Sequence, residues 1–247
     1  MAEVVSDIRH RTRGAATHTH THTGRSIALP STPTPLHWAG EWVHLHVGGL
    51  FSCPKLQPQL GLLIQLLRSV TDARVTVSLD TNCSATPEWG GPEMEGLLRA
   101  CDLFFPNEEE AVGIAQACGL PPGADYEAAA VFLGSFTRIA TVCTAGAQGV
   151  VIAEQGQPPQ KIPPLEGAIA VDPTGCGDAF DAGFLHAWLQ GAELKEAATW
   201  ACCVAAKCLG EVGANTGAGP ARAVQDFVLA TDTRGQLAAQ QSNEELS

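Results

Sequence analysis

The sequence contains 247 residues, of which 45% are hydrophobic, so the chain can bury a sizeable core in one large domain, alone or with a tail. Its 26 acidic residues outnumber the 14 basic ones and give a net charge of −12, which disfavours nucleic-acid backbones and anionic membrane surfaces as partners. No apolar run reaches the ~18 residues of a membrane span, and nine cysteines without Cys-x-x-Cys spacing indicate mostly buried free thiols in a reducing compartment, expected to be the cytoplasm.

The amino-terminal segment, residues 1–36, has the composition of a disordered, low-complexity stretch. It holds Arg9, Arg11 and Arg13, a Thr-His alternation and a proline-rich run, with too little apolar area to offset the entropy cost of ordering. A metal-binding histidine tract, an organellar targeting peptide and an imperfect gene model remain alternatives. We expect a folded domain over residues 37–230 and a polar tail over residues 231–247.

Strands and helices are predicted to alternate from Trp42 onwards. The expected elements are a strand at 42–47, a helix at 60–70, a strand at 75–79, a helix at 93–100 and a strand at 103–105. This βαβα rhythm predicts a parallel sheet sandwiched between helices. His44 and His46 point to one face of the first strand, and without a third ligand nearby they are treated as strand residues rather than metal ligands.

An acidic run follows the third strand. Asn107 precedes Glu108, Glu109 and Glu110, which by itself indicates a helix N-cap with charges that complement the helix dipole. A helix at 126–136 and a strand at 139–143 come next. The turn at Thr144–Gly149 then leads into a strand at 150–152, which indicates a hairpin.

The stretch Val171-Asp172-Pro173-Thr174-Gly175-Cys176-Gly177-Asp178-Ala179-Phe180 predicts a tight turn that opens a helix ending near Gly191. Glycines allow backbone N–H groups to approach a ligand, and the first turn of a helix carries unpaired N–H groups, so the segment can hold a phosphate. At this position the Asp178 carboxylate can act as a general base and take the proton of an attacking hydroxyl. The alternative is that Asp178 only caps the helix.

A helix rich in small residues is predicted at 194–209. Small residues permit close packing against a neighbour. The adjacent Cys202 and Cys203 are expected to be inert on such a packed helix. Pro220 is expected to start a last helix that ends near Ala230.

The stretch at 172–180 closely resembles the signature of the ribokinase-like (PfkB) family of sugar and nucleoside kinases, whose usual form is Asp-Thr-Thr-Gly-Ala-Gly-Asp-Ala-Phe. Pro173 and Cys176 differ from it at positions that contribute mainly backbone. The resemblance implies that Asp178 is the catalytic base and that Gly175, Cys176 and Gly177 form the anion hole. It also implies a monovalent cation, such as K⁺, at Asp172.

Other segments follow the family's order. The resemblance implies that Asn107 and Glu110 organise hydrated Mg²⁺ beside the ATP phosphates. It further implies that Thr144, Gly146 and Gly149 line the phosphates and ribose, and that Cys202 and Gly213 flank the base. The implied fold is a three-layer αβα sandwich, and a homodimer is a further expectation because relatives often dimerise.

The resemblance covers roughly residues 40–230 and does not include the family's amino-terminal substrate motif and lid, so the fold is expected to be N-terminally truncated. One hypothesis is an ATP-dependent kinase that phosphorylates an alcohol group of a sugar or nucleoside. The other is a catalytically inactive nucleotide-binding or scaffold remnant. The sequence contains neither a P-loop nor a protein-kinase catalytic loop.

Overall fold

The structure is a computed structural model that describes residues 5–9, 42–71, 73–82, 89–90, 92–214, 216–217, 223 and 226–227. The chain divides into two compact units. Unit 1 comprises residues 1–144 and 151–160, and unit 2 comprises residues 145–150 and 161–247. Among the helices within the described residues, none is long and apolar enough to cross a membrane.

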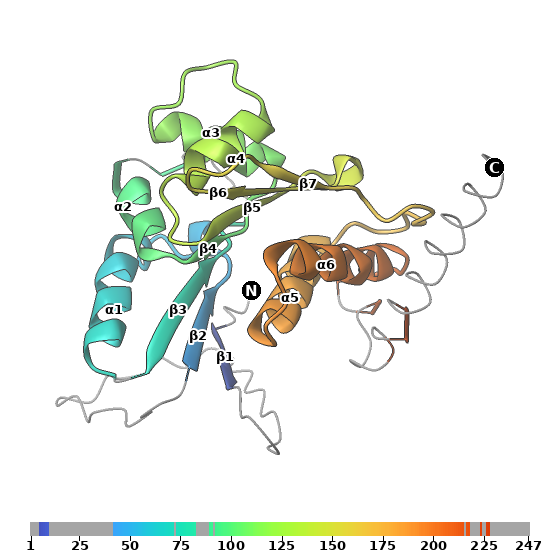
Figure 1. Ribbon diagram of the computed structural model, residues 1–247, viewed down its shortest axis with the longest axis horizontal. Helices are drawn as coiled ribbons and strands as arrows, with labels where there is room; N and C mark the ends of the chain where they lie inside the picture. The colour runs from blue at the N-terminus through green and yellow to red at the C-terminus, as the bar shows by residue number, and fades with distance from the viewer. Residues whose placement is uncertain are drawn as a thin grey trace. The chain divides into compact units, whose positions relative to one another are not determined.

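One sheet of seven strands runs through the structure, and its strands are ordered as they occur in the sequence (Figure 1). They are β1 (Val5–Arg9), β2 (Trp42–Val47), β3 (Arg74–Leu79), β4 (Leu103–Phe104), β5 (Ala140–Thr144), β6 (Val150–Glu154) and β7 (Gln160–Ile162). β1 pairs antiparallel with β2, whereas β2 to β5 are parallel. The links from β5 to β6 and from β6 to β7 are too short for parallel crossovers, so these strands turn back on one another.

Four helices connect the parallel strands of unit 1. They are α1 (Gln57–Ser69), α2 (Pro92–Ala100), α3 (Glu108–Ala117) and α4 (Tyr126–Gly134), and a short 3₁₀ turn, η1 (Leu50–Ser52), precedes α1. α1 packs against α2, and α3 against α4 (Figure 1). Asn107 and Asp125 cap α3 and α4 by accepting a backbone N–H three residues ahead. The parallel α/β organisation predicted from the sequence is confirmed.

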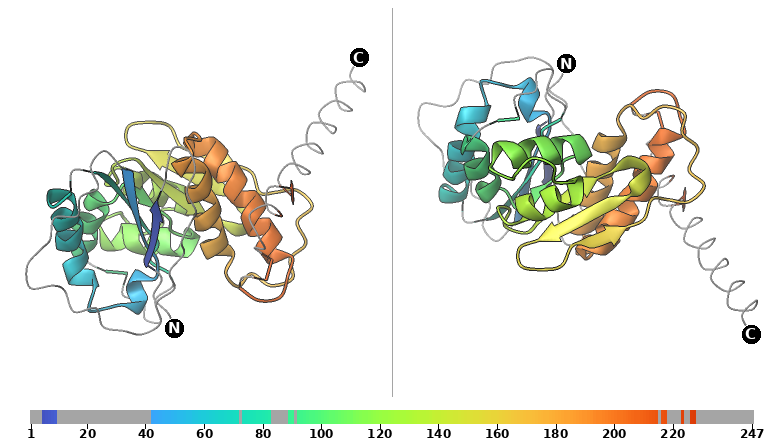
Figure 2. Two further views of the ribbon diagram at one scale, coloured as in Figure 1. Left: turned by 90° about the horizontal axis from the view of Figure 1, so that it is seen from below. Right: turned by 90° about the horizontal axis from the view of Figure 1, so that it is seen from above.

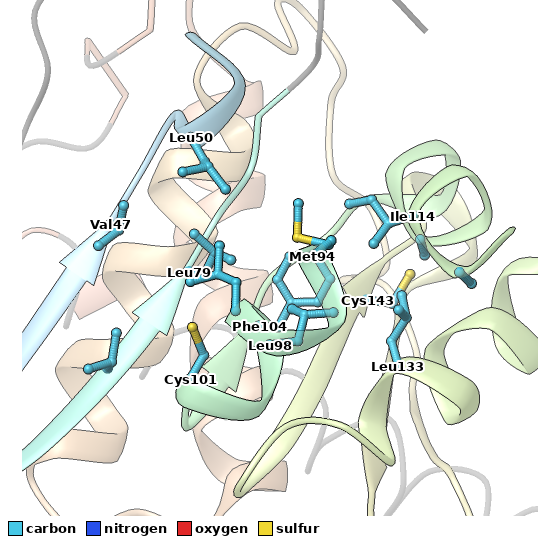
Figure 3. Close-up of a cluster of buried hydrophobic side chains, with 14 of the residues drawn as sticks. Val47, Leu50, Leu79, Met94, Leu98, Cys101, Phe104, Ile114, Leu133 and Cys143 are labelled. Atoms are coloured by element: carbon cyan, nitrogen blue, oxygen red, sulfur yellow. The ribbon is translucent and has the colours of Figure 1, made fainter. Parts of the chain in front are cut away.

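The apolar core of unit 1 lies where these helices meet the sheet. Leu79 and Phe104, from β3 and β4, pack with side chains from α2, α3 and α4 (Figure 3). The helix side chains are Met94, Leu98, Ile114 and Leu133. All six are almost completely buried, and β3 contributes its alternate residues Val75, Val77 and Leu79 to this core.

Polar side chains of β2 and β3 form a hydrogen-bonded chain. Trp42 Nε1 donates to Thr76 Oγ1 at 2.9 Å, and the two ring nitrogens of His44 lie 2.9 Å from Thr76 Oγ1 and from Ser78 Oγ. His46 Nδ1 lies 2.7 Å from the same Ser78 oxygen. Burial lowers the pKa of His44 to about 3 and that of His46 to about 4. Both histidines are therefore neutral strand residues, as the sequence analysis treated them.

The buried carboxylate of Asp102, just before β4, holds several elements of unit 1 together. Asp102 Oδ2 accepts hydrogen bonds from Arg68 Nη2 and from the Val77 amide, both at 2.7 Å. Arg138 Nη1 lies 3.6 Å from the other carboxylate oxygen. Asp102 therefore links α1, β3 and the start of β5 through charge-assisted contacts.

Unit 2 is built on two helices, α5 (Cys176–Leu189) and α6 (Leu194–Leu209), which lie side by side (Figures 1 and 2). They pack closely at Gly183, where a Cβ atom would lie only 2.8 Å from Val204 Cγ2 and 3.1 Å from Ala201 Cα. The small residues that the sequence places on α6 therefore allow close contact with α5.

The structure differs from the sequence predictions mainly at the ends of the sheet. β1 lies inside the segment predicted to be disordered, where its backbone pairs in register with β2 from Val5 to Arg9. β7 was not predicted, because three residues are too few for a period to be recognised. The rest of residues 1–36, most of the helix expected after Pro220, and the tail at 231–247 lie outside the described residues.

Candidate active site

The turn before α5 depends on Gly175. This residue is the N-cap of α5 and has φ 80°, in the left-handed region that L side chains rarely adopt. A Cβ atom at Gly175 would also collide with the carbonyl oxygen of Ala214, in the turn after α6. The two turns of unit 2 therefore meet at a backbone contact that glycine permits.

Asp172 ties the same two turns together. Its Oδ1 accepts the Thr174 amide at 3.0 Å and its Oδ2 accepts the Gly213 amide at 2.9 Å. Hydrogen bonds from the Thr174 side chain and amide, and from the Gly213 amide, lower the pKa of the Asp172 carboxyl. Asp172 therefore has a positioning role, because each of its oxygens holds a backbone amide of one of the two turns. Its predicted role as a K⁺ ligand stays a prediction.

The first turn of α5 presents open amides. The Cys176 amide donates to Pro173 O at 3.1 Å, so that N–H is already used within the turn. The amides of Gly177 and Asp178 have no acceptor among the residues that the structure describes, as expected for the first turn of a helix. Gly177 and Asp178 are both exposed. An anion could therefore reach these two amides, with the Asp178 carboxylate beside them.

Three predicted residues come together in unit 1, at the carboxyl ends of β4 and β5. Thr144 pairs with Asn107 in a parallel bridge, and the Thr144 amide donates to Pro106 O at 2.9 Å. Asn107 Oδ1 accepts the Glu110 amide at 2.9 Å, and Glu110 Oε2 accepts the Asn107 amide at 3.0 Å. This reciprocal capping box is the local arrangement that the sequence indicated.

The capping box decides how Glu110 could serve a metal. Burial raises the pKa of its carboxyl, while the hydrogen bond from the Asn107 amide opposes that shift. One oxygen of the Glu110 carboxylate is engaged by the Asn107 amide, which leaves its second oxygen for Mg²⁺. This ion keeps several waters and needs only one or two carboxylates from the protein. Glu110 therefore fits a water-mediated site. Within the described residues, no three His, Cys, Asp or Glu side chains gather as a metal site.

The remaining predicted residues lie in unit 2. Gly146 opens the 3₁₀ turn η2 (Gly146–Gln148) and is exposed, and Gly149 closes it with φ 87°. A Cβ atom at Gly149 would collide with Ile162 O, so this turn also requires glycine. Cys202 is half-buried on α6, and burial raises the pKa of its thiol to about 11. Asp172, Gly175, Cys176, Gly177, Asp178 and Gly213 form one group in this unit, whereas Asn107, Glu110 and Thr144 form a second in unit 1.

The sequence analysis did not identify Cys208 as part of the site. The Cys208 thiol donates to Ala214 O at 3.4 Å and to Thr174 O at 3.8 Å, between the two turns that Asp172 joins. It also contacts the Cys176 side chain. Burial and this neighbour raise the pKa of the Cys176 thiol to about 11. Because 32 positions separate the two cysteines, no local pattern indicates their contact.

Comparison with known proteins gives, over most of the chain, the same family that the sequence resembles. Residues 22–221 match a family model described as pfkB family carbohydrate kinase. An uncharacterized sugar kinase of Archaeoglobus fulgidus is 32% identical over 130 residues, which is 53% of this chain and 48% of that protein. An adenosine kinase of Schizophyllum commune is 32% identical over 120 residues, which is 44% of this chain and 35% of that protein.

The described fold also matches solved structures. The ribokinase of Arabidopsis thaliana, solved with ribose and ATP, aligns with a TM-score of 0.57 and 25% identity. The match covers 69% of this chain and 52% of that one. The chain thus spans about half the length, or less, of these three proteins.

Proposed function

Because this chain belongs to the pfkB family of carbohydrate kinases and has the ribokinase-like α/β fold, we propose that it is an ATP-dependent phosphotransferase. Its acceptor is an alcohol group of a sugar or nucleoside, the substrate classes named for its relatives. The observation that carries the proposal is the start of α5, where two open amides lie beside the exposed Asp178.

The chemistry follows from this arrangement. The Asp178 carboxylate accepts the proton of the substrate hydroxyl as its oxygen attacks the γ-phosphorus of ATP, and the bond to the bridging oxygen breaks to release ADP. The Gly177 and Asp178 amides donate to the negative oxygens of the transferring group, and the N-terminal end of the α5 dipole adds to this stabilisation. Gly175 and Asp172 position the turn that holds these donors.

The remaining predicted residues, which come from both units, are proposed to serve the nucleotide. Thr144, Gly146 and Gly149 are proposed to line its phosphates and ribose, and Cys202 and Gly213 its base. Glu110, positioned by Asn107, would hold Mg²⁺ through water. When bound, Mg²⁺ neutralises charge on the nucleotide phosphates.

A second candidate function rests on length. Since the chain spans about half of its matched relatives, it could bind a nucleotide without an acceptor site and act as a binding or scaffold protein. This candidate predicts ATP binding without phosphoryl transfer. A screen of ribose, fructose, fructose phosphates and adenosine with Mg²⁺ and ATP, read out as ADP release and phosphorylated product, separates the two candidates.

Asp178→Asn tests the proposed base on any acceptor found in that screen. We expect turnover to fall by roughly 10²- to 10⁴-fold while the Kd for ATP, measured by calorimetry, changes only a few-fold. Glu166→Gln is the matched control, because Glu166 is an exposed carboxylate of the same unit outside the site. Rapid turnover by Asp178→Asn would remove this residue from the role of base.

A further inference from the structure

Two thiols meet beside the turn that precedes α5, in unit 2. Cys176 is the first residue of α5, and Cys208 lies in the last turn of α6. Their side chains contact each other in a small apolar cluster with Ala179 and Val204. Cys176 is partly exposed, whereas Cys208 is fully buried. The pair therefore has one solvent-accessible sulfur and one sulfur behind it.

The surrounding contacts bring both sulfurs to the same turn. Cys176 Sγ donates to Asp172 O at 3.9 Å, and Cys208 Sγ donates to Thr174 O at 3.8 Å. These acceptors are two residues apart in the loop that precedes α5. The same two helices, α5 and α6, also pack closely at Gly183, two turns further along α5. The contact between the thiols is thus part of a well-packed region rather than a contact of loose side chains.

The neighbouring Cys202 and Cys203 do not have this arrangement. They are consecutive residues of α6, so their Cα atoms are ~3.8 Å apart across one peptide. Disulfides usually join Cα atoms separated by roughly 4.4–6.8 Å. A bond between these two cysteines would require the helix to distort.

We propose that Cys176 and Cys208 are a modification site, at which a low-molecular-weight disulfide such as oxidised glutathione converts the two thiols into a reversible disulfide. The bond itself does not depend on the proposed kinase function. Its effect on phosphoryl transfer rests on that function, because Cys176 directly precedes the amides of Gly177 and Asp178.

The reaction proceeds in two exchanges. The Cys176 thiol loses its proton to solvent, and the thiolate attacks one sulfur of the small disulfide, whose S–S bond breaks to release one small thiolate that takes up a proton. The Cys208 thiol then loses its proton and attacks Cys176 Sγ, which releases the second small thiol. The protein loses two electrons and two protons, and one small disulfide is reduced to two thiols. Cys176 reacts first because it is the accessible sulfur.

The new bond would change the candidate active site. An S–S bond of ~2.05 Å is much shorter than a contact between two thiols, so it draws the first residue of α5 towards α6. Gly175 already lies against Ala214 and cannot move with it. The displacement therefore falls on the first turn of α5, where misplacing the phosphate donors by about 1 Å can cost up to roughly 100-fold in turnover.

The test uses the full 247-residue chain, treated with oxidised glutathione at mildly alkaline pH, after which free thiols are alkylated and the protein is digested with trypsin. Cleavage after Lys161, Lys195 and Lys207 places Cys176 on the peptide 162–195 and Cys208 on a peptide that starts at 208. Cys202 and Cys203 lie on the separate peptide 196–207. Mass spectrometry of non-reduced peptides therefore identifies the linked pair without ambiguity.

We expect the peptides of Cys176 and Cys208 to be joined, to separate on reduction, and to remain joined in Cys203→Ala, the matched control on α6. Cys176→Ala, which carries the usual residue of the family signature, and Cys208→Ser should give no such link. Alkylatable thiols at both positions, or a glutathione adduct on Cys176 that never resolves, would overturn the proposal. A link that forms in a protein without phosphotransferase activity would support the modification site while the proposed function fails.

Discussion

The Gly175→Ala substitution tests the geometry on which the start of α5 depends. An alanine in the left-handed region costs roughly 1–2 kcal/mol. Its Cβ atom would also meet Ala214 O at less than van der Waals distance, and overpacking of this kind costs about 1–3 kcal/mol. The two contributions sum to about 2–5 kcal/mol, a large part of the ~5–15 kcal/mol that stabilises a typical domain.

Gly177→Ala provides a matched control two residues away. The Cβ position of Gly177 has no heavy atom within 4 Å, and its φ is not positive. Alanine at this helical position is expected to be neutral or to stabilise α5 by about 0.5–1 kcal/mol. The same chemical change is therefore predicted to have opposite signs at two neighbouring glycines.

Hydrogen exchange of the α5 and α6 amides measures the difference locally, and urea unfolding followed by tryptophan fluorescence measures it globally. A loss of about 2 kcal/mol corresponds to roughly 30-fold faster exchange through the opened state. If Gly175→Ala exchanged and unfolded like Gly177→Ala, the close contact between the signature turn and the turn after α6 would be refuted.

Three further predictions concern unit 1. Glu110→Gln should raise the Mg²⁺ concentration needed for half-maximal turnover, whereas an unchanged titration would leave Glu110 with its capping role alone. Asp102→Asn should lower the free energy of unfolding by about 2–4 kcal/mol in urea, because it removes the buried carboxylate that pairs with half-buried Arg68. Glu95→Gln, in an exposed pair with Arg99, should cost at most about 0.5 kcal/mol. The histidines His44 and His46 have folded pKa values below the ordinary 6.5, so their contribution to stability is complete above pH 6.5 and is lost as the pH falls. Urea unfolding should show a loss of about 1.4 kcal/mol per histidine for each pH unit below 6.5, and a flat profile between pH 6.5 and 4.5 would contradict their burial in the neutral form.

The sequence predicted the elements whose signals are local. The strand at Trp42–Val47 and the helix at Leu194–Leu209 have the bounds expected from periodicity alone. The cap formed by Asn107 and Glu110 was also recognisable, because its two partners are three residues apart. Local patterns of this kind determine backbone conformation within one or two turns.

Contacts between distant residues could not be predicted in the same way. The bond from Asp172 to the Gly213 amide spans 41 positions, and the sequence analysis assigned these two residues to a cation and to the nucleotide base. The family resemblance implied an anion hole that includes Cys176, and in the structure the Cys176 amide donates to Pro173 O within the turn. Such pairings arise from the packing of α5 on α6, which periodicity does not specify.

The strand order described above also bears on how the chain acquires its structure during translation. Since each strand of the sheet neighbours the strand that precedes it in the sequence, every new strand can add to a sheet edge that has already left the ribosome. Each pairing then joins strands that are consecutive in the sequence, which favours assembly from the amino-terminal side. The signature helix is synthesised after the whole sheet, so the parts of the proposed phosphate site mature last.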